Sequence, residues 1–390
     1  MAKTVFILGA GASKAAGAPL MPDFLEVAEN LFLTKRVEEA KDCFEAVMRA
    51  QAELSSVNAK SQLQIRNVED VFSAFEMANT LKKLGDYTPE DIENLVKAMK
   101  TVIVNTIEKT VAFPMSSPGD ISAPSEYAGF VELLSSLREE TNPKSDVAVI
   151  TFNYDMALDY AFYKAGIEPF YGFEDNTTSQ AIPLLKLHGS VNWGECSQCG
   201  EIFPTYVKDY ANPFGVIGFT RDDKTGSARF HFGCSLATQK HKKDGALALP
   251  EPVVIPPTWN KSDHYKGIAK VWIQAARELS SAENIFIIGY SLPDSDSFFR
   301  YLYALGTMGK KILKRLWVFN PDESVKEKFR RMLGPGALQS FDYPLPADKS
   351  KFYQSQILLR QLLVERMDLK DAIESALKAS TPQSWYVRTI

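Results

Sequence analysis

The feature that most constrains this chain is a short apolar run near its N-terminus that ends in a glycine turn. Residues Thr4 to Leu8 read Thr-Val-Phe-Ile-Leu, and Gly9-Ala10-Gly11 follows at once. Apolar runs of this length, rich in β-branched and aromatic residues and bounded by glycine, are typical of buried strands. The run is too short for the core of a signal peptide, so we expect a strand that enters a tight turn.

Further apolar runs of the same kind recur along the chain, at 147–152, 184–187, 253–255, 284–288 and 316–319. Helical stretches lie between most of them, and strands that alternate with helices indicate a parallel sheet covered by helices. The sequence therefore predicts an α/β fold built on a doubly wound, Rossmann-like parallel sheet.

Two segments interrupt this alternation. Residues from about 25 to 140 carry apolar side chains at helical spacing for most of their length, so we expect a helical insertion that caps the sheet or serves assembly. Within this range, residues 113–124 are rich in Pro, Gly and Ser, which predicts a loop there. Residues from about 191 to 249 hold three of the four cysteines and many short polar turns, which predicts a small zinc-ribbon-like module. We divide the chain into one nucleotide-binding domain, 1–345, and a C-terminal helical tail, 346–390.

Composition excludes several classes of protein. Of the 390 residues, 45% are hydrophobic and 24% are charged, which is close to the globular average and unlike a disordered or fibrous chain. The net charge of −4 argues against a protein that binds nucleic acid mainly by charge. No apolar run approaches the roughly 20 residues that span a bilayer. We therefore expect a cytoplasmic protein with no membrane contact and no direct contact to nucleic acid.

The glycine turn after the first strand can bind phosphate. Glycines at Gly9 and Gly11 let the backbone approach a pyrophosphate, and the helix that follows Ala10 offers N–H groups to it. Ser13 adds a hydroxyl for a phosphate oxygen or a ribose. Lys14 stands where the dinucleotide fingerprint has its third glycine, so a plain structural turn is the alternative.

Polar residues also follow two other strands. Asn153 and Asp155 come at the end of the run at 147–152, where they are candidates either for ligand binding or for capping a turn or helix. His188 ends the run at 184–187, and histidine is the side chain best able to exchange a proton near neutral pH. A structural histidine is the alternative.

The last two strands end in similar signals. Gly289 and Ser291 follow the run at 284–288 and form a second turn able to bind phosphate or ribose. Asn320 follows the run at 316–319 and is placed to hydrogen-bond an adenosine ribose.

The cysteines suggest a metal site. Cys196 and Cys199 are two residues apart, a spacing at which two thiolates can chelate one zinc ion. His231 and Cys234 supply a second half of the same spacing and complete a predicted Cys₃His set, with His241 as an alternative fourth ligand. A degenerate knuckle that no longer holds metal is the alternative.

Taken in order, these motifs resemble the sirtuin (silent information regulator) superfamily. The resemblance rests on Gly9-Ala10-Gly11-Ala12-Ser13 with Gly17 and Pro19, Thr151-x-Asn153-x-Asp155, Leu187-His188-Gly189, the Cys196/Cys199 knuckle, Gly289-Tyr290-Ser291 and Asn320. It implies that NAD⁺ binds in the crevice of the sheet. Gly11 and Ser13 would then contact the phosphates, Asn153 and Asp155 the nicotinamide and its ribose, and Ser291 and Asn320 the adenosine end, with His188 as the catalytic base.

Departures from the protein-deacylating sirtuins point to one branch of that family. The arginine that follows their Gly-x-Pro-Asp-Phe is missing after Phe24, and the segment that would pair with a substrate peptide carries Pro256 and Pro257, which cannot donate backbone hydrogen bonds. The Pro-Pro-Thr-Trp and Gly-Tyr-Ser-Leu-Pro segments and the helical insertion resemble bacterial sirtuin-like effectors of anti-phage defence. Those domains hydrolyse NAD⁺ in assemblies, often beside a partner such as a HerA-type ATPase or an Argonaute-like protein.

Three interpretations of function follow. The first is an NAD⁺ glycohydrolase, an NADase that works as a homo-oligomer with a separate sensor or ATPase partner such as a HerA-type protein. The second is an NAD-dependent protein deacylase. The third is a non-enzymatic NAD-binding subunit whose helical insertion and tail serve assembly.

Overall fold

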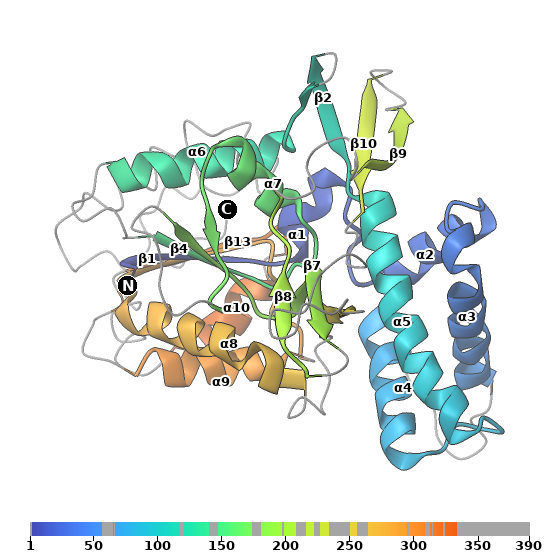
Figure 1. Ribbon diagram of the computed structural model, residues 1–390. Coiled ribbons are helices and arrows are strands. Elements are labelled where there is room, and N and C mark those ends of the chain that lie inside the picture. The colour runs from blue at the N-terminus through green and yellow to red at the C-terminus, as the bar shows by residue number, and fades with distance from the viewer. Residues whose placement is uncertain are drawn as a thin grey trace.

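The computed structural model in Figure 1 describes most of the first 333 residues. The described ranges are 2–56, 65, 67–117, 120–139, 147–173, 181–196, 199–207, 216–221, 227–233, 250–255, 264–294, 296–308, 313, 315–322 and 324–333. The predicted tail at 346–390 and most of 208–249 lie outside them, as do Cys234 and His241.

A six-stranded, wholly parallel sheet forms the centre of the fold and confirms the predicted class. Its strand order is β13-β12-β1-β4-β6-β5. The bounds are β1 Thr4–Leu8, β4 Val147–Thr151, β5 Pro169–Phe170, β6 Ile182–Lys186, β12 Asn284–Ile288 and β13 Arg315–Phe319. Every residue of β1, β4 and β12 is buried, as expected of strands covered on both faces.

Helices cover both faces of this sheet (Figure 1). Helix α6, Ser125–Glu139, lies over one face and packs against β4 and α7, Ala157–Lys164. Helices α8, His264–Ser281, α9, Ser297–Gly306, and α10, Ser324–Arg330, lie over the other face. The architecture is therefore doubly wound, as the alternation of strands and helices predicts.

The helical insertion stands beside the sheet (Figure 1). It comprises α2, Phe24–Leu33, α3, Lys41–Ser56, α4, Val68–Leu81, and α5, Pro89–Thr110. Local signals set its boundaries: Asn67 accepts the N–H groups of Glu69 and Asp70, and Thr88 forms a capping box at the start of α5. Because α6 packs on the central sheet, the insertion proper ends near residue 110 rather than at the predicted 140.

Two small antiparallel sheets complete the described fold. One has the order β3-β2-β10-β9 and the other the order β11-β7-β8. The bounds are β2 Phe113–Ser117, β3 Asp120–Ile121, β7 Gly189–Cys196, β8 Ile202–Pro204, β9 Val216–Arg221, β10 Ala228–Phe232 and β11 Pro250–Val254.

These sheets correct two predictions. The run at 253–255 was expected among the strands of the parallel sheet, but Val253 and Val254 belong to β11, which pairs antiparallel with β7. Pro250 and Pro252 have no backbone N–H group to donate to a neighbouring strand, which suits the edge position that β11 occupies. The segment at 113–124 was expected to be a loop because of its Pro, Gly and Ser content, yet Phe113 and Pro114 pair with β10, more than a hundred residues away.

Register aligns the ends of five strands in one row. Leu8 lies opposite both Thr151 and Ile288, Ile288 lies opposite Phe319, and Thr151 lies opposite Lys186. The loops that begin at residues 9, 152, 187, 289 and 320 therefore all leave from the same edge of the sheet.

None of the helices that the structure describes is long and apolar enough to cross a membrane.

Glycine allows the turns after β1 and β12 to pack backbone against backbone. Gly11 N–H donates to Gly289 O at 3.0 Å. A Cβ on Gly9 would lie 2.5 Å from the Cα of Tyr290, and one on Gly11 would lie 2.9 Å from Gly289. At Gly289, where φ is +63°, a Cβ would lie 2.4 Å from Ala12 N. The close contact between the two turns thus requires all three glycines. The sequence pattern had instead suggested that these glycines serve to bind phosphate.

We expect Gly289→Ala to lower the free energy of unfolding by roughly 2–4 kcal/mol, because it adds both left-handed strain and a backbone clash. Urea unfolding followed by circular dichroism measures this. Gly218→Ala is the matched control, since nothing lies within 4 Å of a Cβ at Gly218 and its φ is unexceptional. Equal stability of the two variants would contradict the role given to the turn.

Candidate active site

A cavity of about 280 Å³ opens at the edge of the sheet where the five strands end. Its volume is close to the lower bound of about 300 Å³ for small-molecule sites. The predicted site residues that line it are Ala10, Gly11, Ser13, Asn153, Asp155, His188, Gly289, Ser291 and Asn320. Gly9 lies directly behind this wall, at the contact between the two turns. The structure thus gathers around one cavity residues that are up to 310 positions apart in the chain.

The cavity lies at the point where the strand order reverses. From β1 the chain continues to β4 and β6 on one side, and later crosses to β12 and β13 on the other. Open α/β sheets bind their ligands at such switch points, outside the carboxyl ends of the strands. Topology alone therefore makes this cavity the first candidate for an active site.

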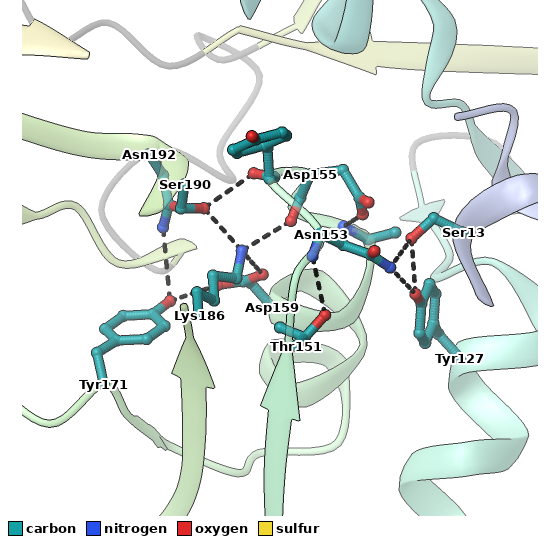
Figure 2. Close-up of polar contacts among 12 residues, drawn as sticks. Ser13, Tyr127, Thr151, Asn153, Asp155, Asp159, Tyr171, Lys186, Ser190 and Asn192 are labelled. Atoms are coloured by element: carbon teal, nitrogen blue, oxygen red, sulfur yellow. Dashed lines mark hydrogen bonds and ion pairs between the residues drawn. The ribbon is translucent and has the colours of Figure 1, made fainter. Parts of the chain in front are cut away.

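Asn153 joins the loop after β4 to the turn after β1. Its Nδ2 donates to Gly9 O and to Ser13 Oγ, both at 2.9 Å, and lies 3.4 Å from Tyr127 OH. Ser13 Oγ and Tyr127 OH share a hydrogen bond of 2.7 Å (Figure 2). The amide nitrogen is thereby engaged, and among the described residues no hydrogen bond to the Asn153 Oδ1 atom is formed. That oxygen can accept a hydrogen bond from a molecule in the cavity.

Asp155 serves as a cap while it lines the cavity. Its Oδ1 accepts the N–H of Ala157 at 2.9 Å, in the first turn of α7. Burial raises the pKa of the Asp155 carboxyl, and the nearby Lys186 ammonium opposes that rise. Both interpretations of this residue, cap and site residue, are compatible with where it lies.

Hydrogen bonds to backbone carbonyl groups fix the segment that carries His188. Leu187 O accepts from Trp272 Nε1 at 3.1 Å, and His188 O accepts the N–H of Ile255 at 2.9 Å. Gly189 adopts φ +80°, where a Cβ would strike Val253 O, so the turn after His188 requires glycine. The buried imidazole meets the ring of Phe152 edge-on, with centroids 5.0 Å apart.

A carboxylate that sequence reasoning missed lies beside His188. Asp296 Oδ2 is 3.6 Å from His188 Nε2 and accepts a hydrogen bond of 2.6 Å from Tyr290 OH. The Tyr290 ring stacks on Phe152 at 4.1 Å. Burial, and then Asp296, raise the pKa of the Tyr290 hydroxyl well above its ordinary value, so it stays a donor. Asp296 gave no signal in sequence because it follows its strand by eight residues.

Asn320 and Ser291, the residues predicted to contact adenosine, form hydrogen bonds that stabilise the loops after β13 and β12. Asn320 Oδ1 accepts the N–H of Asp322 at 3.0 Å, and its Nδ2 donates to Tyr290 O at 3.4 Å. Ser291 O accepts from Lys328 Nζ at 3.4 Å. Asn320 therefore ties the end of β13 to the turn after β12, and both loops form one wall of the cavity.

The helical insertion supplies the opposite wall. Glu69 from α4 and Ile107 from α5 line the cavity, together with Phe24 and the segment 18–22 that leads into α2. Glu69 and Ile107 gave no signal in the sequence, because their spacing is that of ordinary helix positions, whereas Pro19 and Phe24 belong to the segment that resembles sirtuins. The cavity is thus enclosed between the sheet edge and the insertion.

Beneath the cavity a buried lysine joins three segments of the site. Lys186 Nζ donates to Asp155 O and to Ser190 Oγ, each at 2.7 Å, and pairs with Asp159 Oδ2 at 2.7 Å (Figure 2). Asp159 in turn accepts from Tyr171 OH at 2.6 Å. All of these groups are buried, so the ammonium is compensated by one carboxylate and two neutral oxygens. The pair fixes the loop after β4 relative to the turn that carries His188.

The predicted zinc ligands are not brought together by the described residues. Cys196 ends β7, whereas His231 lies on β10 in the other small sheet. The Nδ1 and Nε2 atoms of His231 are hydrogen-bonded to Val111 O and Thr220 Oγ1, at 2.9 and 3.1 Å. Within the part of the chain that the structure describes, no group of three or more His, Cys, Asp or Glu residues could hold a metal. Since Cys234 and His241 lie outside it, zinc binding stays a prediction.

Comparisons with known proteins give similarity to solved structures only. No protein-family model and no curated protein matches the sequence. Similar structures include a mutant Sir2 homologue in complex with ADP ribose, at 15% identity and a TM-score of 0.40, covering 97% of this chain and 94% of that one. A Sir2 homologue–NAD complex matches at 15% and 0.33, over 82% and 78% of the two chains. Sir2Af2 bound to a myristoylated histone peptide matches at 14% and 0.31, over 95% and 92%. At these scores no family, ligand or activity is carried over.

We expect Lys186→Met to lower the free energy of unfolding by about 3–5 kcal/mol, because it leaves the Asp159 carboxylate buried without its cation. The double variant Lys186→Met/Asp159→Leu removes both charges and should lose less than the single variant. Guanidinium unfolding at neutral pH measures both. Lys164→Met is the control, since its pair with Asp120 is partly exposed and worth about 0–1 kcal/mol. A single variant as stable as this control would show that the buried pair contributes little.

The zinc prediction is tested by metal analysis of the purified protein. If the knuckle binds zinc, Cys199→Ser should lower the zinc content substantially. His231→Gln should leave it unchanged if the hydrogen bonds of His231 persist in solution, and a loss of zinc in that variant would restore His231 to the ligand set. Protein without bound zinc would favour the degenerate knuckle.

Proposed function

We propose that this chain is an NAD⁺ glycohydrolase, which cleaves NAD⁺ to nicotinamide and ADP-ribose. The observation that best supports the proposal is that Ser13, Asn153 and His188 line one cavity at the switch point. These are the positions at which the sequence resembles sirtuins, a family that binds NAD⁺ in this crevice.

Electrostatics of the cavity suit the departure of nicotinamide. Asp155, Asp296 and Glu69 contribute carboxyl groups to its lining, and no lysine or arginine occurs among the described residues that line it. The bond that breaks in NAD⁺ joins a cationic pyridine ring to ribose, and positive charge moves onto the ribose as the ring leaves. Carboxylates placed where that charge develops stabilise the transition state.

His188 and Asn153 are placed for the attack of water. The C1′–N bond breaks and its electron pair leaves with nicotinamide, while a water oxygen forms the new bond to C1′. The proton that this water loses passes to a ring nitrogen of His188 and then to solvent. Asn153 Oδ1 accepts a hydrogen bond from that water or from a ribose hydroxyl, since its Nδ2 is already engaged with Gly9 and Ser13.

An NAD-dependent protein deacylase is the second candidate, and one observation weighs against it. A deacylase must lay a peptide beside the strand that follows the site, which here is β11. Helix α5 contacts β11, so the insertion occupies space next to that strand. Pro256 and Pro257, which would impair strand addition, lie outside the described residues. A non-enzymatic NAD-binding subunit is the third candidate.

Resemblance to the bacterial sirtuin-like branch supports a biological setting for this activity. We infer that the protein depletes NAD⁺ as the effector of an anti-phage system, as a homo-oligomer with a separate partner such as a HerA-type ATPase. Loss of cellular NAD⁺ on infection, dependent on this chain, is the result that this inference requires.

Incubation of the purified protein with NAD⁺ should yield nicotinamide and free ADP-ribose, resolved by chromatography. Removal of the base in His188→Ala should lower kcat by about 10²–10⁴-fold. Asn153→Ala should lower it strongly as well, because the nucleophile loses its position. Asn105→Ala is the matched control, because the Asn105 amide donates to Thr101 O within α5 and Asn105 is not among the described residues that line the cavity.

Two outcomes would redirect the assignment. Turnover that persists in folded His188→Ala protein would remove that residue from the chemistry. Product that forms only with an acylated peptide present, and as O-acyl-ADP-ribose, would establish the deacylase instead. Binding of NAD⁺ without turnover in either assay would favour the non-enzymatic subunit or a missing partner.

A further inference from the structure

Asp296 occupies a position at which aspartate ordinarily caps a helix. It is the N-cap residue of α9, where a carboxylate usually accepts an N–H from the first turn. The Asp296 side chain makes no such bond. It is 1% exposed and turned away from its own helix, toward Tyr290 OH and His188 Nε2.

We propose that Asp296 is the carboxylate partner of His188, which orients its imidazole and raises its basicity for the reaction proposed above. The two side chains come from opposite sides of β1: His188 from the end of β6, and Asp296 from the loop between β12 and α9. The separation of 3.6 Å between Nε2 and Oδ2 is an ion-pair distance. Catalytic hydrogen bonds are commonly long in protein without ligand and tighten when substrate binds.

Tyr290 fixes the carboxylate in turn. Its hydroxyl donates to the same Oδ2 atom at 2.6 Å, and its ring is stacked on Phe152, whose edge meets His188. Phe299 from α9 packs edge-on against both Phe152 and Tyr290. The imidazole and its carboxylate are therefore held in one aromatic frame, which limits their relative movement.

Other titratable groups face the same space and must be separated from Asp296. Asp155 and Glu69 line the cavity as well, and the Tyr154 ring lies 6.1 Å from that of His188. Lys186 is two residues away but turns its ammonium toward Asp155 O and Asp159. Asp296 lies within ion-pair distance of the imidazole, with its Oδ2 atom 3.6 Å from His188 Nε2.

The test is a titration of His188 by nuclear magnetic resonance in the protein without ligand. The chain has four histidines, so His188→Gln identifies the signal. A carboxylate within about 4–6 Å raises an imidazole pKa by roughly 1–3 pH units. The pKa of His188 should therefore fall by that amount in Asp296→Asn. Glu69→Gln should shift it less.

Asp294→Asn is the matched control. Asp294 lies in the same loop, but its side chain is 94% exposed and pairs with Arg300 at the surface. It should leave both the His188 pKa and turnover unchanged. Asp296→Asn should also lower kcat about 10²-fold or more, and move the acidic limb of the kcat/KM profile to lower pH, because a less basic imidazole loses its proton earlier. A purely structural role for Asp296 would not move that limb.

The titration does not depend on turnover, so the two proposals fail separately. A His188 pKa that is the same in Asp296→Asn and in the wild type overturns the pairing, whatever the enzyme does to NAD⁺. A shifted pKa in a protein that consumes no NAD⁺, either alone or with its partner, keeps the pairing and overturns the function. If the Asp296→Asn variant does not fold, the pKa of His188 in the wild-type protein is the deciding measurement. Burial alone would lower this pKa below about 6.5, the ordinary value for histidine. A measured pKa above about 6.5 therefore supports the adjacent carboxylate, and one below it counts against it.

Discussion

Alignment of five strand ends in one row is the constraint on which the site depends. Phe319, Ile288, Leu8, Thr151 and Lys186 lie side by side across the sheet. Backbone hydrogen bonds extend this ladder one residue further, from Gly9 N–H to Ile288 O, Phe152 N–H to Leu8 O, and Gly289 N–H to Phe319 O. A slip of one strand would carry its loop about 3.3 Å along the sheet and open the cavity wall.

Strand patterns made the sheet and much of the cavity predictable from sequence. Fully buried parallel strands are short, continuous apolar runs, and the runs at 4–8 and 284–288 coincide with β1 and β12. Because parallel strands end at a common edge, the polar residues that follow them, such as Asn153 and His188, could be expected to meet. The order of the strands was not needed for that expectation.

What sequence did not reveal depends on contacts between distant segments. Lysine is ordinarily a surface residue, so the sequence did not suggest that Lys186 is buried. Its ammonium can be buried because Asp159 and Ser190 approach it from other segments. Asp296 looks like a helix cap, and its direction is set by Tyr290. The pairing of β2 with β10 joins segments more than a hundred residues apart, so a composition typical of loops was misleading there.

Most of the polar residues of this site serve structure and cavity at once, which affects how their substitution should be interpreted. Asn153 ties two loops together, Asp155 caps α7 and Asn320 ties a third loop. Substitution of any of these residues therefore removes a structural hydrogen bond as well as the polar group that faces the cavity. His188 and Asp296 differ, because the imidazole and the carboxylate face the cavity and each other while backbone and aromatic contacts hold their segments. A loss of activity at these two positions with unchanged stability is therefore the more direct evidence about the reaction. For the loop-tying residues, activity has meaning only beside a measured free energy of unfolding.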